Sequence, residues 1–413
     1  MKNNEKDKDD GDDKIDMRPW LDSLPQSFDT PIRWTVEQRN ALQYTPLVGM
    51  IAIQESLTRK THEKLLQALS SSSSTSLKDI FTYEKFLWGC DCARSRAFSG
   101  SYGGSAFDPK PYAFTLLLVA VYIGLGMGTI EQASNGAGLV LCGSILKDFV
   151  FPKLFKSKKY IICPMVDMAN HVGIEEDANV AFEYFTNGYS LNTKADVTLG
   201  ENSKEEVFIS YGPRSNDALL QQYGFVEADN AHDVYVMPPL REWDIAALEE
   251  ACGRKFQPGR LQKLERAGLL GGNSLGNTPG QENEEDLDAF EEGVANRGRG
   301  VVVTRAGGID PAIITALRVL VSSEEEWLAV GEAVGNLVTV NSGGKENERL
   351  ALVVAQKALE LELLAKPTTL GEDEESWKNK NSLGLGTEDM LALQFRIEKK
   401  KLLKEAMFAL SLL

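Results

Sequence analysis

Histidine and cysteine are scarce in this sequence, and their scarcity restricts the metal and redox chemistry open to it. The 413 residues include three histidines and five cysteines, and the cysteines are scattered and odd in number. Cys90 and Cys92 have no second pair with which to complete a tetrahedral zinc site, so we expect no metal. The same cysteine pattern argues against a disulfide framework and favours a reducing intracellular compartment.

Positive charge is scarce too. Lysine and arginine together number 44 against 60 acidic residues, which gives a formal net charge of -16. Because nucleic-acid phosphates repel such a chain and no large basic patch stands out, we expect no nucleic-acid partner. Residues 1–17 combine many charges with almost no apolar side chains, so we predict a disordered tail rather than a signal or transit peptide.

The apolar periodicity predicts a β-rich middle and a helical remainder, which together make an α+β protein. Short β-rich runs separated by Gly, Asn and Pro cover 160–166, 180–185, 206–211 and 234–237. Apolar residues three and four apart predict helices over 46–69, 78–95, 309–321, 324–336, 346–365 and 387–411. The Gly-, Asn- and acid-rich segment 271–300 indicates a surface insertion, and a short strand is expected at 301–304.

Three clusters combine aromatic residues with polar or charged ones. The first surrounds Arg96, and the second is the Pro-Met-Val-Asp-Met-Ala-Asn-His string at 164–171. The third is Phe-Ile-Ser-Tyr-Gly-Pro-Arg-Ser-Asn at 208–216, continued by Tyr-Gly-Phe-Val at 223–226. Singly, each has a structural explanation: a hydrogen-bonded turn, a core tyrosine with a satisfied hydroxyl, or an arginine whose stem covers an apolar face.

Together, in this order, the clusters resemble the SET-domain methyltransferases, specifically the branch of the Rubisco large-subunit lysine methyltransferase. Residues 368–374 and 395–399 are similar to the helical substrate-binding domain of that branch. The resemblance implies a β-rich SET domain, incomplete at its N-terminus, over 18–240 with a helical insertion at about 99–159. It implies an all-α substrate-binding domain over 241–413, with 271–300 as a flexible insertion.

The resemblance also implies an activity: methyl transfer from S-adenosylmethionine to a lysine ε-amine of a protein. It assigns Tyr211 to catalysis, Arg96, Asn170, His171 and Phe225 to cofactor binding, and Asp167 and Tyr223 to substrate binding, with Tyr223 and Phe225 lining an aromatic channel. The expected partner is the Rubisco large subunit or another protein. By resemblance the compartment is the chloroplast, with the cytoplasm as the alternative, and the oligomeric state is open.

The sequence departs from the family in two places. The family's Gly-x-Gly segment is expected upstream of Arg18, where only the charged tail stands, so we expect either an incomplete chain or an incomplete cofactor site. The stretch between Arg96 and Asn170 is also long, and within it 111–130 is uncharged and long enough to span a bilayer. Because the resemblance implies that both ends of this insertion line one pocket, a single crossing of the membrane is excluded. A helical hairpin, an interfacial or re-entrant element through 111–150, and an excursion packed on the protein stay open.

The sequence is compatible with two other functions. One arm of the branch modifies imidazole, so a protein-histidine methyltransferase is the alternative enzyme. A protein without a working cofactor site would instead be a non-catalytic, substrate-binding protein.

Overall fold

The computed structural model describes residues 16–71, 81–100, 159–185, 188–194, 206–267, 300–329 and 340–413, with single residues at 115, 121 and 269. Most of the predicted tail, of the uncharged run at 111–130 and of the insertion at 271–300 lies outside the described residues, so the predictions for them stay predictions. Where the structure does describe the chain, it contains no helix both long and apolar enough to cross a membrane.

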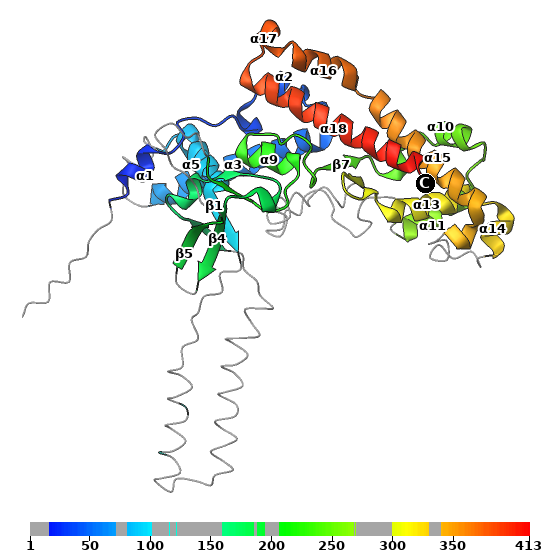
Figure 1. Ribbon diagram of the computed structural model, residues 1–413, viewed down its shortest axis with the longest axis horizontal. Helices are drawn as coiled ribbons and strands as arrows, with labels where there is room; N and C mark the ends of the chain where they lie inside the picture. The colour runs from blue at the N-terminus through cyan, green and yellow to red at the C-terminus, as the bar shows by residue number, and fades with distance from the viewer. Residues whose placement is uncertain are drawn as a thin grey trace, which may run out of the picture. The chain divides into compact units, whose positions relative to one another are not determined.

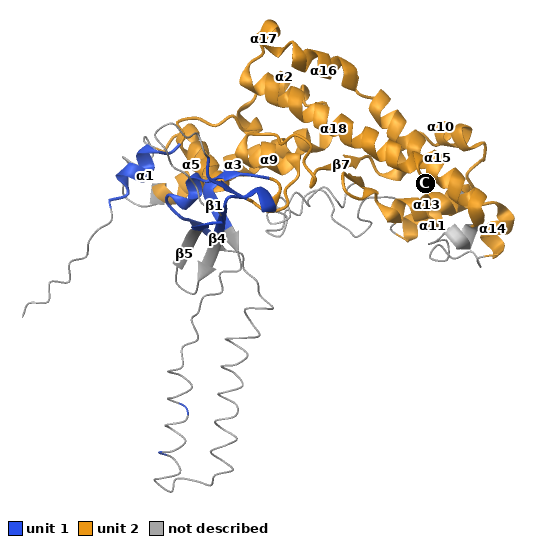
Figure 2. Ribbon diagram, in the orientation of Figure 1, with its two compact units in different colours: residues 1–24, 96–172, 176–209 blue, residues 25–95, 173–175, 210–413 orange. Residues whose placement is uncertain are grey.

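The chain divides into two compact units (Figure 2). The first unit contains residues 1–24, 96–172 and 176–209, and the second contains 25–95, 173–175 and 210–413. The predicted domain boundary at 240/241 stays a prediction.

The first unit is built from short paired strands, as the β-rich pattern predicts. The antiparallel pairs are β1 (Ala97–Gly100) with β2 (Lys159–Ile162), and β4 (Val180–Phe185) with β5 (Gly188–Thr193). The parallel pair is β3 (Asn170–His171) with β6 (Phe208–Ile209). Its helical elements are α1 (Arg18–Asp22), η3 (Val166–Met168) and part of η4 (Glu175–Asp177).

The second unit is mainly helical. Its N-terminal part contains η1 (Pro31–Arg33), α2 (Val36–Asn40), α3 (Thr45–Ser71), α5 (Tyr83–Arg96) and α9 (Asn216–Tyr223). The last residue of α5, Arg96, belongs to the first unit. Its C-terminal part contains η5 (Leu240–Glu242), α10 (Ile245–Cys252), α11 (Pro258–Arg266), α13 (Pro311–Val321), α14 (Glu324–Ala329), α15 (Val340–Leu364), α16 (Leu370–Lys378), α17 (Lys380–Leu383) and α18 (Thr387–Ser411) (Figure 1).

One three-stranded antiparallel sheet completes the second unit. It contains β7 (Val234–Met237), β8 (Val301–Thr304) and β9 (Gly308–Ile309), in the order β7-β8-β9. The strands expected at 234–237 and 301–304 are therefore present, and they pair with each other. Because β8 is hydrogen-bonded between two neighbours, the stretch 241–413 is not exclusively helical.

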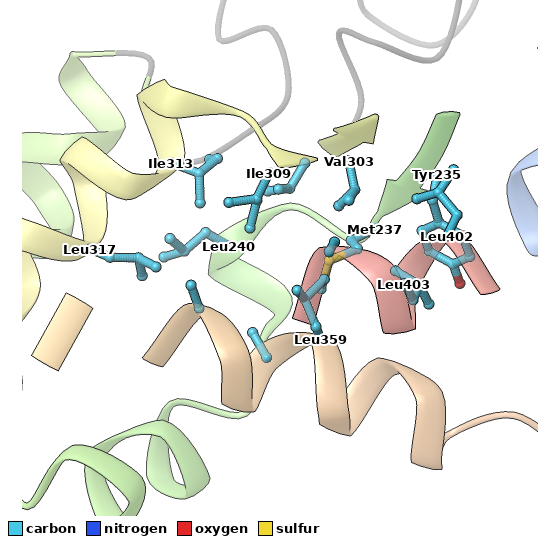
Figure 3. Close-up of a cluster of buried hydrophobic side chains, with 14 of the residues drawn as sticks. Tyr235, Met237, Leu240, Val303, Ile309, Ile313, Leu317, Leu359, Leu402 and Leu403 are labelled. Carbon is cyan, nitrogen blue, oxygen red and sulfur yellow. The ribbon is translucent and has the colours of Figure 1, made fainter. Parts of the chain in front are cut away.

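A large hydrophobic cluster forms most of the described core of the second unit. Figure 3 shows part of it, in which side chains of β7, β8 and β9 meet those of the surrounding helices; the labelled residues are Tyr235, Met237, Leu240, Val303, Ile309, Ile313, Leu317, Leu359, Leu402 and Leu403. The same cluster includes Leu42, Tyr44 and Leu47 from the N-terminal part of the chain. The helix expected at 387–411 is confirmed as α18, and it packs against both α15 and α16.

Candidate functional site

Arg96 and Asp167 lie in direct contact. Arg96 is the last residue of α5, and the pairing of Ala97 with Ile162 brings it next to the loop that follows β2. Its Nη1 donates to Asp167 Oδ2 at 3.1 Å and to the Asp167 carbonyl oxygen at 3.2 Å. The residue assigned to the cofactor and the carboxylate assigned to the substrate thus form one ion pair.

Burial and Trp20 fix this ion pair. The Asp167 side chain is 0% exposed, and Trp20 Nε1 donates to its Oδ2 at 3.0 Å. Two polar atoms of the pair, Asp167 Oδ1 and Arg96 Nε, are buried and have no hydrogen-bond partner among the residues described. Buried polar atoms normally find partners, so an acceptor and a donor are left for something else.

The turn before Asp167 is strained. Met165 has φ 74° and ψ -44°, a conformation that costs a non-glycine residue roughly 1–3 kcal/mol. This conformation lets the chain enter η3 with Asp167 directed inward, while the Met165 side chain is 78% exposed. Strain of this kind is typical of functional loops.

The Asn-His string lies beside the strand that leads to Tyr211. The parallel pairing of β3 with β6 sets Asn170 opposite Phe208 and His171 opposite Ile209. The Asn170 backbone N–H donates to Val207 O at 2.8 Å. The Asn170 side chain is exposed, and its amide nitrogen donates to Glu206 Oε2 at 3.1 Å.

Three aromatic rings gather on the segment that follows β6. The Tyr211 and Tyr223 ring centroids are 4.9 Å apart at 31°, and those of Tyr223 and Phe225 are 6.2 Å apart at 56°. The Arg214 guanidinium lies 5.7 Å from the Tyr223 ring centroid, within range of a cation–π contact. The rings and the arginine thus form one half-buried aromatic cluster.

Two glycines explain why each tyrosine of this cluster begins a Tyr-Gly pair. Gly212 has φ 87°, and Gly224 has φ 77° in the left-handed conformation that ends α9. Glycine adopts such angles without the steric penalty of a side chain. The chain can therefore turn directly after Tyr211 and after Tyr223.

The structure brings the predicted site residues together in three groups. Arg96 contacts Asp167, the Asn170–His171 strand pairs with β6, and Tyr211 lies against Tyr223, whose other neighbour is Phe225. The convergence of these groups around one cofactor stays a prediction.

Sequence reasoning missed the residues that hold these groups in place. Trp20 was assigned no role, and nothing in its neighbourhood signals a contact with Asp167. Asn216 closes the Ser-Tyr-Gly-Pro-Arg-Ser-Asn string, and its complete burial gives it a structural role. Its partner Asp233 and the buried Lys399 carry no local sequence signal.

Comparisons with known proteins agree with this architecture. The family model described as Rubisco LSMT substrate-binding matches residues 255–403. A solved structure of the SET domain of LSMT bound to lysine and AdoHcy aligns with a TM-score of 0.52 at 17% identity, covering 97% of this chain and 72% of that one. The expected resemblance and the α+β fold are thereby confirmed.

Two known relatives are longer than this chain. The actin-histidine N-methyltransferase of Danio rerio is 20% identical over 401 residues, which are 94% of this chain and 51% of the relative. SET domain-containing protein 4 of Homo sapiens is 38% identical over 76 residues, 18% of this chain and 16% of the relative. The chain thus spans about half, or less, of the length of these relatives.

Proposed function

We propose that this chain carries the core of a SET-type protein methyltransferase, which moves a methyl group from S-adenosylmethionine to a lysine ε-amine of a protein substrate. The observation that carries the proposal is the parallel pairing of β3 with β6, because it sets the Asn-His string beside the strand leading into Tyr211. The fold similarity to the LSMT SET domain and the methyltransferase names of the relatives support it.

Arg96 and Asn170 offer the polar atoms that S-adenosylmethionine requires. The buried Arg96 Nε has no partner in the described part of the chain, and a guanidinium suits the carboxylate of the cofactor's methionine part. Asn170 uses its amide nitrogen on Glu206, which leaves the amide oxygen for the cofactor's amino group. We propose that His171 and Phe225 also contribute to cofactor binding, as the resemblance implies. When bound, S-adenosylmethionine supplies a methyl group activated by its sulfonium charge.

The aromatic cluster would prepare the target amine. A lysine amine has a reference pKa of about 10.4 and must lose its proton before it can attack. Desolvation between Tyr223 and Phe225 would lower that pKa, so no dedicated general base is needed. Tyr211 would direct its hydroxyl oxygen at the reaction centre and orient the amine.

Histidine is the second candidate target. The curated relatives that cover most of this chain are named for histidine methylation, whereas the aligned LSMT structure holds lysine. An imidazole nitrogen is already largely deprotonated near neutral pH, so the same aromatic cluster would need to orient it rather than desolvate it.

Calorimetric titration with S-adenosylhomocysteine tests the cofactor site. We expect binding to the wild-type chain and weaker binding to Asn170→Ala, because the amide oxygen is lost. Asn192→Ala, a change at another exposed asparagine, is the control and should bind like the wild type. No binding by the wild type would favour the non-catalytic, substrate-binding function, and unaltered affinity in Asn170→Ala would reject the assigned pocket.

Mass spectrometry of proteins incubated with the chain and a labelled methyl donor identifies the target. A methylated lysine supports the leading proposal, and a methylated histidine supports the second. We propose the Rubisco large subunit as the first protein to test, and the chloroplast as the compartment in which to look for the chain.

A further inference from the structure

The segment that carries the aromatic cluster is folded back on itself by Asn216. The Asn216 side chain donates to Glu227 O at 3.0 Å and accepts from the Glu227 backbone N–H at 2.9 Å. Asn216 follows Tyr211 by five residues, and Glu227 follows Phe225 by two. This pair of hydrogen bonds therefore closes the loop 216–227, which contains Tyr223 and Phe225, and Tyr211 lies five residues before the loop begins.

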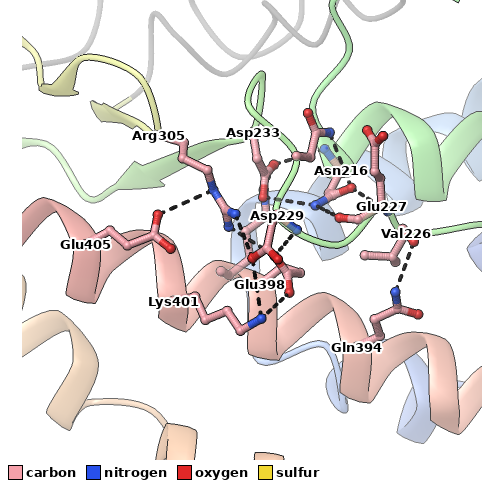
Figure 4. Close-up of polar contacts among 12 residues, drawn as sticks. Asn216, Val226, Glu227, Asp229, Asp233, Arg305, Gln394, Glu398, Lys401 and Glu405 are labelled. Carbon is pink, nitrogen blue, oxygen red and sulfur yellow. Dashed lines mark hydrogen bonds and ion pairs between the residues drawn. The ribbon is translucent and has the colours of Figure 1, made fainter. Parts of the chain in front are cut away.

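Asp233 holds Asn216 in turn. Its Oδ1 accepts from the Asn216 backbone N–H at 2.9 Å, and its Oδ2 accepts from the Asn216 side chain at 3.2 Å (Figure 4). Asn216 and Asp233 are both 0% exposed. A buried carboxylate is costly without a cation, so the loop depends on whatever neutralises Asp233.

The cation comes from α18, far along the chain. Lys399 Nζ donates to Asp233 Oδ1 at 2.8 Å, to Asp217 Oδ2 at 2.5 Å and to Val234 O at 2.6 Å. All three ammonium protons thus have acceptors. Although burial works against the charge, Asp217 and Asp233 raise the pKa of Lys399 above its usual value, which keeps it a cation.

Other side chains of α18 hold the return of the same loop (Figure 4). Gln394 Nε2 donates to Val226 O at 3.1 Å, and Glu398 Oε2 accepts from the Asp229 backbone N–H at 2.8 Å. The helix therefore contacts the loop at several points, with Lys399 at the buried centre.

We propose that Lys399 is a positioning residue for methyl transfer: through Asp233 and Asn216, it holds Tyr211, Tyr223 and Phe225 in their working arrangement. This inference rests on the proposed function. It gives α18 a second role, because the part of the helix up to residue 403, Lys399 included, lies in the stretch that matches the substrate-binding family. An ångström-scale displacement of a catalytic group can cost about 100-fold in rate. A small shift of the aromatic residues after loss of Lys399 would therefore lower kcat measurably.

The neighbouring Lys400 provides a matched control. It is also buried, but its Nζ donates to Asp373 Oδ2 at 2.5 Å and to Thr368 O at 2.7 Å. Those partners lie in α16 and just before it, away from the aromatic segment. Loss of this lysine removes a buried ion pair from the same helix without touching the loop.

The test compares two sets of charge-free variants. Lys399→Met is combined with Asp217→Asn and Asp233→Asn, so that no buried carboxylate is left without its cation. The control combines Lys400→Met with Asp373→Asn. For each, kcat, the affinity for S-adenosylhomocysteine and amide hydrogen exchange at residues 211–227 are measured. If the triple variant does not fold, Asp233→Asn and Asp373→Asn replace the two sets, since Asp233→Asn keeps an acceptor oxygen and leaves Lys399 paired with Asp217.

We expect kcat to fall about 10- to 100-fold in the Lys399 set. Amides 216 and 227 should exchange faster in that set. Cofactor affinity should fall less than kcat, because Phe225 is the one cofactor-binding residue assigned to this loop, and the Lys400 set should stay like the wild type. Equal effects in the two sets would overturn the inference, as would unchanged exchange at residues 211–227. If the wild-type chain transfers no methyl group but the exchange difference remains, the proposed function fails and the hold of Lys399 on the loop stands.

Discussion

At the scale of single residues, Asp167 combines complete burial with a carboxylate oxygen left unsatisfied by the described part of the chain. Its carboxylate is fully buried, and one oxygen, Oδ2, accepts hydrogen bonds from Trp20 and Arg96. The other oxygen, Oδ1, has no hydrogen-bond partner among the residues described. A carboxylate in that state is expensive to bury, so its free oxygen marks a place where a polar ligand group would gain a partner.

Tyr211 is the residue whose replacement separates binding from catalysis. Tyr211→Phe removes only the hydroxyl oxygen, so we expect methyl transfer to fall at least about 100-fold, while affinity for S-adenosylhomocysteine is kept. Tyr189→Phe, at a tyrosine of β5 to which no site role is assigned, is the matched control. Radiometric transfer assays and calorimetry measure the two effects, and undiminished turnover would show that another residue is catalytic.

Tyr235 should make the protein less stable at alkaline pH. Burial, reinforced by Glu362, raises the pKa of Tyr235 well above its usual value of 10.0. The folded chain therefore holds this proton more tightly than the unfolded chain, so the stabilisation is complete below pH 10 and is lost as pH rises above it. We expect the melting temperature to fall between about pH 9 and pH 12, and less steeply in Tyr235→Phe. An identical slope in that variant would contradict this, and Tyr160→Phe, at an exposed tyrosine, is the control.

The sequence predicted roles for single residues but not the contacts between them. The motif strings assign Arg96 and Asp167 to opposite substrates, but the two are 71 positions apart and no sequence feature announces their contact. The hydrogen bond from Trp20 spans 147 positions and was equally invisible. Contacts of this kind depend on how strands pair, which periodicity does not encode.

At the scale of elements, α16 shows what local chemistry contributes. Thr369 and Glu372 form a capping box, in which the Thr369 hydroxyl accepts from the Glu372 backbone N–H and the Glu372 carboxylate accepts from the Thr369 backbone N–H. We expect Thr369→Ala to lower the free energy of unfolding by about 1 kcal/mol. Chemical denaturation measures the change.

Thr61→Ala is the control for this prediction. Thr61 is exposed in the middle of α3, where its hydroxyl donates to Leu57 O. Alanine is the better helix former there, so we expect no loss of stability. A loss equal to that of Thr369→Ala would show that the capping box contributes nothing of its own.

Several predicted elements have their expected bounds, whereas two of the predicted strands are shorter than expected. The apolar spacing gave α18 its observed bounds and placed α3 and β7 within a residue or two. The runs at 160–166 and 206–211 shortened to β2 and β6, because the chain turns into η3 and into the Tyr-Gly pair instead of continuing a ladder. Tertiary contacts, rather than propensity, end these strands.

At the scale of the whole molecule, the core of the second unit joins distant stretches of sequence. Leu42, Tyr44 and Leu47 lie in the same hydrophobic cluster as residues of α13, α15 and α18. Tyr44 also accepts the backbone N–H of Val236 through its hydroxyl at 2.8 Å. The resemblance implies a boundary at 240/241, and the cluster has members on both sides of that point.

A fragment of residues 241–413 tests that boundary. It lacks β7, the hydrogen-bonding neighbour of β8, and the N-terminal members of the core. We therefore expect it to bind a hydrophobic dye and to melt without a sharp transition, unlike the full chain. A cooperative transition in the fragment would establish 240/241 as a domain boundary.

The two adjacent buried lysines of α18 have a consequence for how this helix can move. Successive residues of a helix point about 100° apart, so Lys399 and Lys400 reach different neighbours. Lys399 pairs with Asp217 of α9 and with Asp233 just before β7, and Lys400 pairs with Asp373 of α16. If α18 rotated about its axis, at least one ammonium group would move away from its carboxylate. Neither group would then be solvated, because both lie in the protein interior. Both buried ion pairs therefore oppose rotation of α18 about its own axis.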